Sequence, residues 1–110
     1  MELETINVAS TVKSIGYECF TACQGLKQIS FGGANSKLER IEHRAFFNAV
    51  QLYSIEVPET LNFVGSYAFS YCGKLSKIYS YKSATGWNNL SINTPVDNAV
   101  FTNEAIREYV

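Results

Sequence analysis

The 110-residue sequence lacks most of the features that assign a chain to a functional class directly. No apolar run approaches 18 residues, so we expect no segment that spans a membrane. The N-terminus has no basic segment followed by an apolar stretch, so we expect no signal peptide in this chain. The 9 basic and 10 acidic residues are spread along the sequence, which argues against the basic patch of a nucleic-acid-binding surface.

Catalytic motifs are missing as well. The sequence has one histidine, and it contains no G-x-S-x-G, no glycine-rich phosphate loop and no H-E-x-x-H. We expect His43, between Glu42 and Arg44, to be a solvated surface residue. We interpret Glu39 and Glu42 as part of a solvated face rather than an acid–base pair. The sequence therefore predicts no enzyme, no catalytic residue, no metal site and no cofactor.

What the sequence does contain is an apolar pattern that occurs three times, in residues 12–31, 38–57 and 61–80. When the segments are aligned, large apolar residues form five columns: Val12/Leu38/Leu61, Ile15/Ile41/Val64, Phe20/Phe46/Phe69, Leu26/Leu52/Leu75 and Ile29/Ile55/Ile78. Small residues form two more: Cys19/Ala45/Ala68 and Cys23/Ala49/Cys72. A unit of about 20–29 residues is too small to bury its own apolar face, so we expect the units to stack.

One strand is predicted in each unit. In the pattern L-x-x-I-x-F of residues 26–31, Ile29 and Phe31 point to one side and Gln28 and Ser30 to the other. This alternation is typical of a strand that is buried on one face. Stacked units would therefore place their strands side by side in a parallel sheet.

A short helix is predicted before each strand. Cys19, Phe20 and Cys23 fall at positions i, i+1 and i+4, which places them on one side of a helical turn. The small residues would let this turn approach the sheet, and the phenylalanine would fill the gap. Each coil is thus expected to contain a strand, a turn, a short extended segment and a short helix.

The three cysteines are expected to be free. Cys23 and Cys72 occupy one column two coils apart, a separation of about 10 Å at a strand spacing of about 4.8 Å. A disulfide needs Cα atoms within about 7 Å. Cys19 and Cys23 are one helical turn apart and would need distortion to join. Free cysteine behaves as a small buried hydrophobe, which suits these columns.

We expect one domain, divided into a partial unit 1–11, complete units 12–37, 38–60 and 61–81, and a divergent unit 82–110. The partial unit is indicated by Leu3-x-x-Ile6-x-Val8, which matches the strand pattern of the later units. This favours a fragment of a longer array. The alternative is a lone strand that serves as a native N-terminal cap.

The pattern weakens after the third unit. Ser80 interrupts the last apolar column, and we expect Tyr81 to turn inward in its place. Residues 82–98 are polar, and we expect Trp87 to cover the end of the core. Periodicity then returns, because Val100-Phe101 resembles the Ala-Phe pair of the other units. A last strand is expected from Ile106, Tyr109 and Val110.

These residues resemble the BspA-like leucine-rich repeats, whose pattern is roughly I-x-x-x-A-F-x-x-C-x-x-L-x-x-I-x-[IVF]-P. In this sequence the pattern reads Ile41…Ala45-Phe46…Leu52…Ile55-x-Val57-Pro58 and Val64-Gly65…Ala68-Phe69…Cys72…Leu75…Ile78. The resemblance implies an α/β, right-handed leucine-rich-repeat solenoid. It would have a parallel sheet of about four to five short strands on one face and short helices or turns on the other. Many members are bacterial surface proteins, so the resemblance also implies a secreted or cell-surface location.

The outward strand positions line up across the coils and form our candidate partner-binding strip. Its members are Gln28, Ser30, Ser54, Glu56, Lys77 and Tyr79. Rigid mixed surfaces suit protein partners, and tyrosine is enriched in binding hot spots. The alternative is that these are solvated strand residues with no partner.

Three functions remain open from the sequence. The first is a protein-interaction or adhesion module that binds an extracellular or host protein. The second is a carbohydrate-binding module that stacks glycans on Tyr53, Tyr79, Tyr81 and Trp87. The third is a spacer that holds other domains away from a surface and binds nothing.

Overall fold

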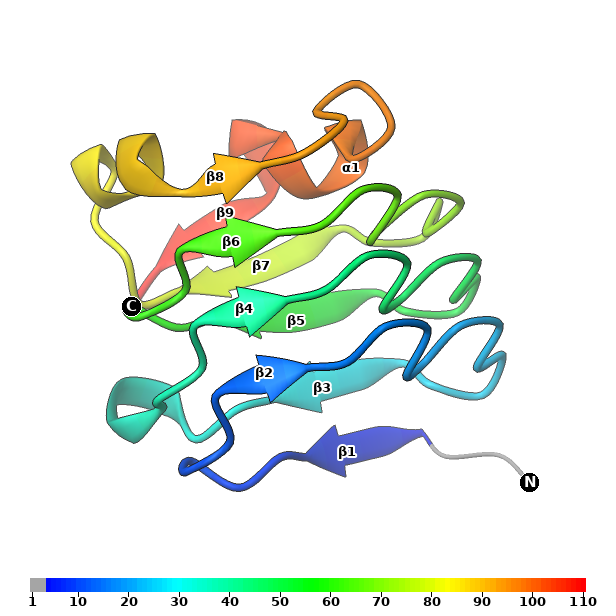
Figure 1. Cartoon of the computed structure of the whole chain (residues 1–110), viewed down its shortest axis with the longest axis horizontal. Helices are drawn as coiled ribbons and strands as arrows, with labels where there is room; N and C mark the ends of the chain where they lie inside the picture. Colours follow the sequence, from blue (N-terminus) through cyan, green and yellow to red (C-terminus); the bar gives the residue numbers. More distant parts are fainter. Residues whose placement is uncertain (1–3) are drawn as a thin grey trace.

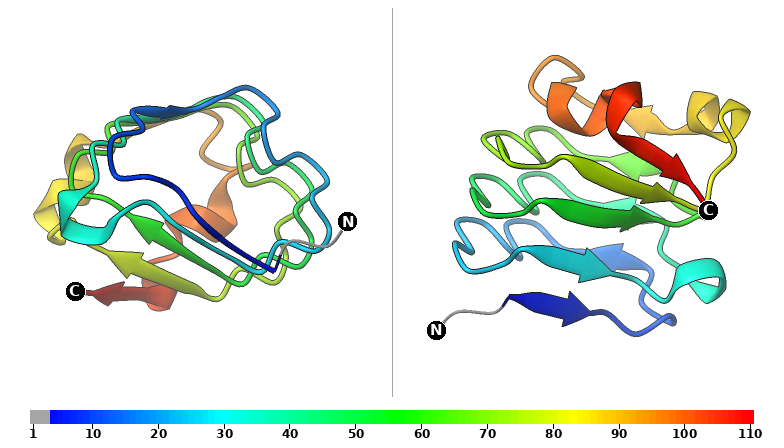
Figure 2. Two further views of the ribbon diagram at one scale, coloured as in Figure 1. Left: turned by 90° about the horizontal axis from the view of Figure 1, so that it is seen from below. Right: turned by 180° about the vertical axis from the view of Figure 1, so that it is seen from behind.

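The computed structural model describes residues 4–110, so the predicted match at Leu3 lies outside the described residues. The chain winds into a solenoid of about four turns, with two parallel sheets on opposite sides of one core (Figures 1 and 2). The predicted parallel-sheet solenoid is confirmed. Its interior is narrow enough for the apolar columns to fill.

The larger sheet has five strands, in the order β1 (Thr5–Asn7), β3 (Gln28–Ser30), β5 (Ser54–Val57), β7 (Lys77–Ser80) and β9 (Arg107–Tyr109). The smaller sheet has four, in the order β2 (Ser14–Ile15), β4 (Arg40–Ile41), β6 (Phe63–Val64) and β8 (Ser91–Ile92). The short helices are the 3-10 helices η1 (Gly33–Asn35), η2 (Thr85–Asn89) and η3 (Glu104–Ile106) and the α-helix α1 (Ala99–Thr102).

The sheets align equivalent residues of successive coils. In the larger sheet Ile29 pairs with Ile55, and Ile55 pairs with Ile78. In the smaller sheet Ile41 pairs with Val64. All five side chains are buried, so each apolar column of the sequence becomes a stack in the core.

The phenylalanine column forms a continuous ring stack. The ring centroids of Phe20 and Phe46 are 5.2 Å apart, and those of Phe46 and Phe69 are 5.3 Å apart, with interplanar angles of 12° and 11°. Phe101 continues the stack, 4.3 Å from Phe69, as its resemblance to the other phenylalanines predicted. Phe46, Phe69 and Phe101 have no exposed surface, whereas Phe20 at the end of the stack is half-buried.

The predicted helix around each phenylalanine is wrong, because this segment forms tight turns instead. Residues two before and two after each phenylalanine have positive φ, although none is glycine: Glu18, Ala22, Arg44, Asn48, Tyr67 and Tyr71. Backbone groups of the turns bind the neighbouring coil, as where the Phe20 N–H donates to the Ala45 carbonyl at 2.7 Å. These bonds offset the roughly 1–2 kcal/mol that each left-handed residue costs, and they replace the hydrogen bonds of a helix.

The C-terminal end of the core is covered. Trp87 is buried against Phe101, with ring centroids 5.5 Å apart, so the predicted covering role of Trp87 is confirmed. Its indole N–H donates to the Ser80 hydroxyl at 2.9 Å, which keeps that serine buried in the apolar column. Tyr81 does not replace Ser80. Ser80 stays in the column because its hydroxyl is hydrogen-bonded there, and Tyr81 lies half-buried beside Gly33.

The last strand has a different register from the one expected. Arg107, rather than Ile106, pairs with Ile78. The guanidinium carbon of Arg107 lies 3.6 Å from the centre of a Trp87 ring, and its side chain is only 7% exposed. Arg107 thus closes the apolar core with its planar head stacked on the indole, and its Nη2 donates to the Thr102 carbonyl at 3.2 Å.

Behind the third turn, the Asn98 side chain makes hydrogen bonds of the kind that the backbone of a further coil would make. It is fully buried, and its side-chain oxygen accepts from the Phe69 N–H at 2.8 Å. Its amide group donates to the carbonyls of Gly65 and Asn93, at 3.1 and 2.9 Å. Thr94 has the same role, because its hydroxyl oxygen accepts from the Tyr67 N–H of the third coil at 3.1 Å.

Candidate binding surfaces

The predicted strip lies on the outward face of the larger sheet, where all of its residues except Lys77 line a shallow hollow of about 140 Å³ together with the ends of β1. The parallel register brings its members into adjacent pairs, such as Gln28 beside Ser54 and Glu56 beside Tyr79. Ser54 is buried in the floor, and Tyr79 is 38% exposed at the rim. The face is therefore continuous from coil to coil.

Much of the strip is already hydrogen-bonded within the protein. The Gln28 side-chain amide donates to the Tyr53 hydroxyl. The Ser30 hydroxyl donates to the side-chain oxygen of Asn7 at 2.6 Å. At the N-terminal side of the face, a partner would therefore contact polar groups that are held in place and already make some of their hydrogen bonds within the protein.

Glu56 has a structural role that the sequence pattern did not reveal. Its Oε1 accepts from the backbone N–H groups of Phe31 and Gly33, at 2.9 and 3.1 Å. The carboxylate thus holds the start of the η1 turn beside the sheet. Its removal would leave two backbone donors without this acceptor, so Glu56 is a poor probe of binding.

Lys77 and Tyr79 are the strip residues best placed to meet a partner. The Lys77 ammonium lies 6.0 Å from the centre of the Tyr79 ring, at the outer limit of a cation–π contact. Within residues 4–110, Lys77 forms no ion pair. The strip thus places a half-buried lysine next to an exposed aromatic ring.

The predicted glycan platform does not form, because its four rings do not lie on one open surface. Trp87 is buried between Phe101 and Arg107, so a glycan has no access to its faces. Tyr81 is half-buried. Tyr53 and Tyr79 are exposed.

Two of the three side chains considered for catalysis, His43 and Glu42, are engaged in structural contacts. His43 is exposed, and its Nδ1 accepts from the Ser66 N–H at 2.8 Å. Arg40 holds Glu42 through a bond of 2.7 Å from Nε to Oε2, and this hydrogen bond lowers the pKa of the Glu42 carboxyl from its ordinary value. Glu39 is exposed and takes no part in that pair.

The cysteines are all free, as predicted, but they differ in burial. Cys72 is buried, and its thiol donates to the Phe46 carbonyl at 3.1 Å. Burial raises the pKa of the Cys72 thiol to about 12. Cys19 is exposed although its column was expected to be buried, because no coil of the described structure covers the first turn.

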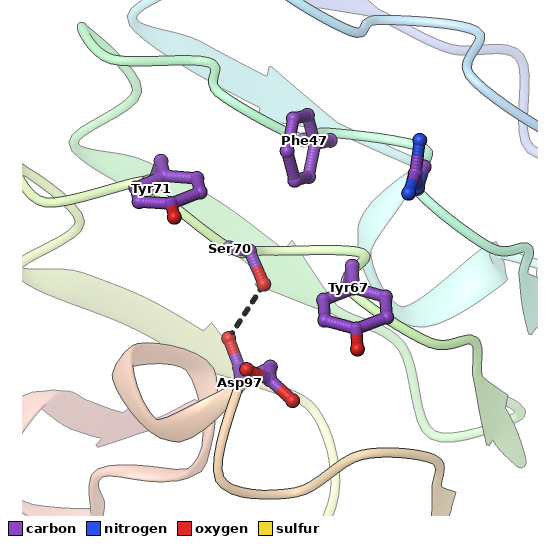
Figure 3. A pocket seen from close by; sticks show the side chains of 6 residues that line it. Phe47, Tyr67, Ser70, Tyr71 and Asp97 are labelled. Carbon is purple, nitrogen blue, oxygen red and sulfur yellow. Dashed lines mark hydrogen bonds between the residues drawn. The ribbon is translucent and has the colours of Figure 1, made fainter.

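A second surface, which the sequence did not indicate, lies on the side of the tight turns. We call it the turn-side pocket; it encloses about 450 Å³ and is lined by Arg44, Phe47, Tyr67, Ser70, Tyr71 and Asp97. Figure 3 shows Tyr67 and Tyr71 on either side of Ser70, with Phe47 and Asp97 beyond it in opposite directions. None of these residues belongs to an apolar column, which is why repeat alignment missed them.

The turn-side pocket is held together by local contacts. The Ser70 hydroxyl donates to the Asp97 carbonyl at 2.9 Å, the bond drawn in Figure 3. Phe47 and Tyr71 pack edge to face, with ring centroids 5.5 Å apart. The Arg44 guanidinium carbon lies 5.2 Å from the Phe47 ring centre and 5.8 Å from that of Tyr67.

Across residues 4–110, no helix is both long and apolar enough to cross a bilayer. In the same residues, no three His, Cys, Asp or Glu side chains gather in a way that could hold a metal ion.

Comparisons with known proteins agree with this architecture. Neither the curated proteins nor the solved structures gave a match to the chain. The model of the family described as BspA type leucine rich repeat region (6 copies) matches residues 1–108, which is nearly the whole sequence. From this match and the stacked coils, the chain belongs to the BspA-type leucine-rich-repeat family.

Proposed function

We propose that the chain is a protein-interaction module of a secreted or cell-surface protein, and that it binds its partner with the outward face of the larger sheet. The repeat family supports an interaction role of this general kind. The observation that carries the choice of surface is the Lys77–Tyr79 pair, in which Lys77 lies beside the exposed ring of Tyr79 and Tyr79 lines a shallow hollow of the sheet.

The backbone under this face favours binding because it is already ordered. All five strands are parallel and hydrogen-bonded in register, so docking a partner orders little of the sheet itself. Side chains such as Ser30 and Gln28 are also held by internal hydrogen bonds. A preorganised face loses less conformational entropy on association, and more of the contact energy remains as affinity.

The chemistry of the face suggests what it would bind. Tyr79 offers a ring for an apolar or aromatic side chain, and tyrosine is frequent among hot-spot residues. Lys77 offers a cation without an ion-pair partner within residues 4–110. We expect an extracellular or host protein that presents a carboxylate next to an apolar side chain, which would make the module adhesive.

The test is a binding screen of the chain against extracellular proteins, followed by variants of the face. Lys77→Ala and Tyr79→Ala should each weaken binding roughly tenfold or more, which is about 1.4 kcal/mol. Lys37→Ala and Tyr17→Ala are matched controls, because both residues are exposed away from the larger sheet. A partner whose affinity is unchanged by the first two variants would contradict the proposed surface.

Glu56→Gln is a better third variant than Glu56→Ala. Glutamine keeps a side-chain oxygen for the Phe31 and Gly33 N–H groups while it removes the charge. Its effect on binding can then be read separately from any effect on folding. A module that acts only as a spacer would bind no protein in the screen, and that result would overturn the proposed function.

A further inference from the structure

The turn-side pocket is an unusual place for large aromatic side chains. Arg44, Tyr67 and Tyr71 all have positive φ, at 56°, 59° and 63°. Bulky residues rarely adopt this conformation, and asparagine or glycine would adopt it with less strain. The conformation directs their side chains outward, and Tyr71 is 71% exposed. In the second and third coils, the turn conformation thus carries exposed aromatic side chains.

The pocket is a local feature and not a property of every coil. The residues of the first turn that correspond to Arg44 or Tyr67 and to Tyr71 are Glu18 and Ala22, which have the same positive φ but no ring. Within the described residues, the aromatic cluster thus lies over the second and third coils and not over the first. Exposed aromatic side chains that gather in one place mark binding sites more often than scattered ones do.

The two ends of the pocket carry opposite charges. Arg44 belongs to the second coil and Asp97 follows the third, so they are separated by about two coil spacings, or about 10 Å. Within residues 4–110 neither side chain forms an ion pair. The guanidinium of Arg44 faces two rings, which leaves its N–H edges free to donate.

We propose that the turn-side pocket binds a short, extended peptide segment with an acidic and a basic side chain three residues apart. In the polyproline II conformation, three residues rise about 9 Å at about 3.1 Å per residue and complete one turn, so both charged side chains project to the same side. This length is close to the two coil spacings between the backbone segments that carry Arg44 and Asp97. The acidic side chain would accept hydrogen bonds from Arg44, and the basic one would pair with Asp97. The residues between them would pack against Tyr67 and Tyr71.

The shape of the pocket suits a proline-rich or similarly extended segment. Segments of this kind dock into grooves lined by aromatic rings, because their extended conformation is ordered before binding. The oxygen of the Ser70 hydroxyl, whose proton is used on the Asp97 carbonyl, remains able to accept a backbone N–H. A neutral sugar would use the rings but leave both charges without partners, so a peptide fits the pocket better.

This site is separate from the larger sheet, so its test does not depend on the proposed function. The probes are four blocked peptides whose central residues are Asp-Pro-Pro-Arg, Asn-Pro-Pro-Gln, Asp-Pro-Pro-Asp and Arg-Pro-Pro-Arg. A fifth probe is a panel of neutral sugars. Each is titrated into the ¹⁵N-labelled full chain, and the backbone amide shifts of the pocket residues are followed.

We expect Asp-Pro-Pro-Arg to shift the amides of Phe47, Ser70 and Tyr71 with a Kd of about 1 mM or tighter. The neutral and like-charged peptides should bind roughly tenfold more weakly, a difference of about 1.4 kcal/mol. Equal binding of the neutral peptide, or no saturating shift with any peptide, would overturn the proposal. Sugar-induced shifts at these amides without peptide-induced shifts would assign the pocket to glycans and would also overturn it.

Variants of the pocket complete the test. Arg44→Gln and Asp97→Asn should each remove the preference for the doubly charged peptide. Tyr71→Asn should weaken every peptide, and asparagine tolerates the positive φ of that position, so the fold is kept. Tyr17→Ala is the control, because Tyr17 is 62% exposed on the first turn, outside the pocket. Unchanged binding in Tyr71→Asn would contradict the role of the rings.

Discussion

The two ends of the solenoid are built differently. At the first turn, Phe20 is half-buried and Cys19 is exposed. At the other end, Phe101 is fully buried beneath Trp87, and Arg107 covers the indole. The same ring stack thus has one open end and one closed end.

The direction of the turn hydrogen bonds explains what the closed end needs. Each turn donates its N–H groups to the coil that follows it, as Phe20 does to Ala45 and Phe46 does to Ala68. The third turn therefore needs acceptors behind it, and Asn98 supplies one to Phe69. At the first turn, the groups left without a neighbouring coil are carbonyls. They need partners less than the N–H groups of the third turn do, since unpaired carbonyls are tolerated better than unpaired N–H groups. A side-chain cap is required only at the end toward which the donors point.

The largest expected effects come from the ring stack. Phe46→Ala and Phe101→Ala should each lower the free energy of unfolding by about 3–5 kcal/mol, because both rings are fully buried. Phe20→Ala should cost clearly less, since its ring is stacked on one side only. Urea denaturation of the three variants measures the difference. Equal losses for Phe20 and Phe101 would show that the two ends are equally closed.

Asn98→Ala should have the next largest effect. The change leaves the Phe69 N–H without its acceptor, and a buried unpaired group costs about 1–3 kcal/mol, whereas the Gly65 carbonyl keeps the Ala68 N–H at 3.3 Å. Asn62→Ala is the control, because that side chain is exposed and makes no side-chain hydrogen bond among the described residues. A loss no greater than that of the control would refute the role of Asn98 as a cap.

Gly16 and Gly65 occupy equivalent positions in the first and third coils, so substitutions there compare the open and closed halves of the solenoid. A Cβ atom built on Gly65 would lie 2.4 Å from the His43 backbone nitrogen, whereas one built on Gly16 meets nothing within 4 Å. Gly65→Ala should therefore destabilise the protein through backbone shifts, by about 1–3 kcal/mol. Gly16→Ala should be neutral or slightly stabilising. Thermal unfolding of both variants tests the close approach of the coils, which equal melting temperatures would contradict.

The smallest perturbation is chemical labelling of the thiols. Iodoacetamide at pH 8 should modify Cys19 at the open end readily. Cys72 should react far more slowly, because it is buried and its pKa of about 12 leaves almost no thiolate at that pH. Mass spectrometry of peptides over time gives the order of modification. Rapid modification of Cys72 in the folded chain would mean that the closed half opens easily.

The sequence predicted the core well, because the apolar residues that align in columns are the residues that become buried. Ile29, Ile55 and Ile78 alternate with polar residues, and the structure pairs them in register. The tight turns could not be predicted in the same way. Their left-handed residues include Glu18, Arg44 and Tyr67 in equivalent positions, so no residue type marks the conformation.

The candidate surfaces were predicted less completely. Alternation located the strip, but it could not show that Glu56 binds backbone N–H groups or that Trp87 is covered by Arg107. Those contacts join residues of different coils, and their relative positions become known only from the fold. The turn-side pocket combines Tyr71 with Asp97 from a segment that does not repeat, so no alignment of units could have found it.

Amide hydrogen exchange tests the stacking of turns on one another most directly. The Phe20, Phe46 and Phe69 N–H groups each donate across to the next coil or its substitute, at 2.7, 2.9 and 2.8 Å. We predict slow exchange at all three amides in the intact chain, and selective loss of protection at Phe69 in Asn98→Ala. Fast exchange at Phe46 in the intact chain, or a uniform loss of protection in the variant, would contradict this account of the fold.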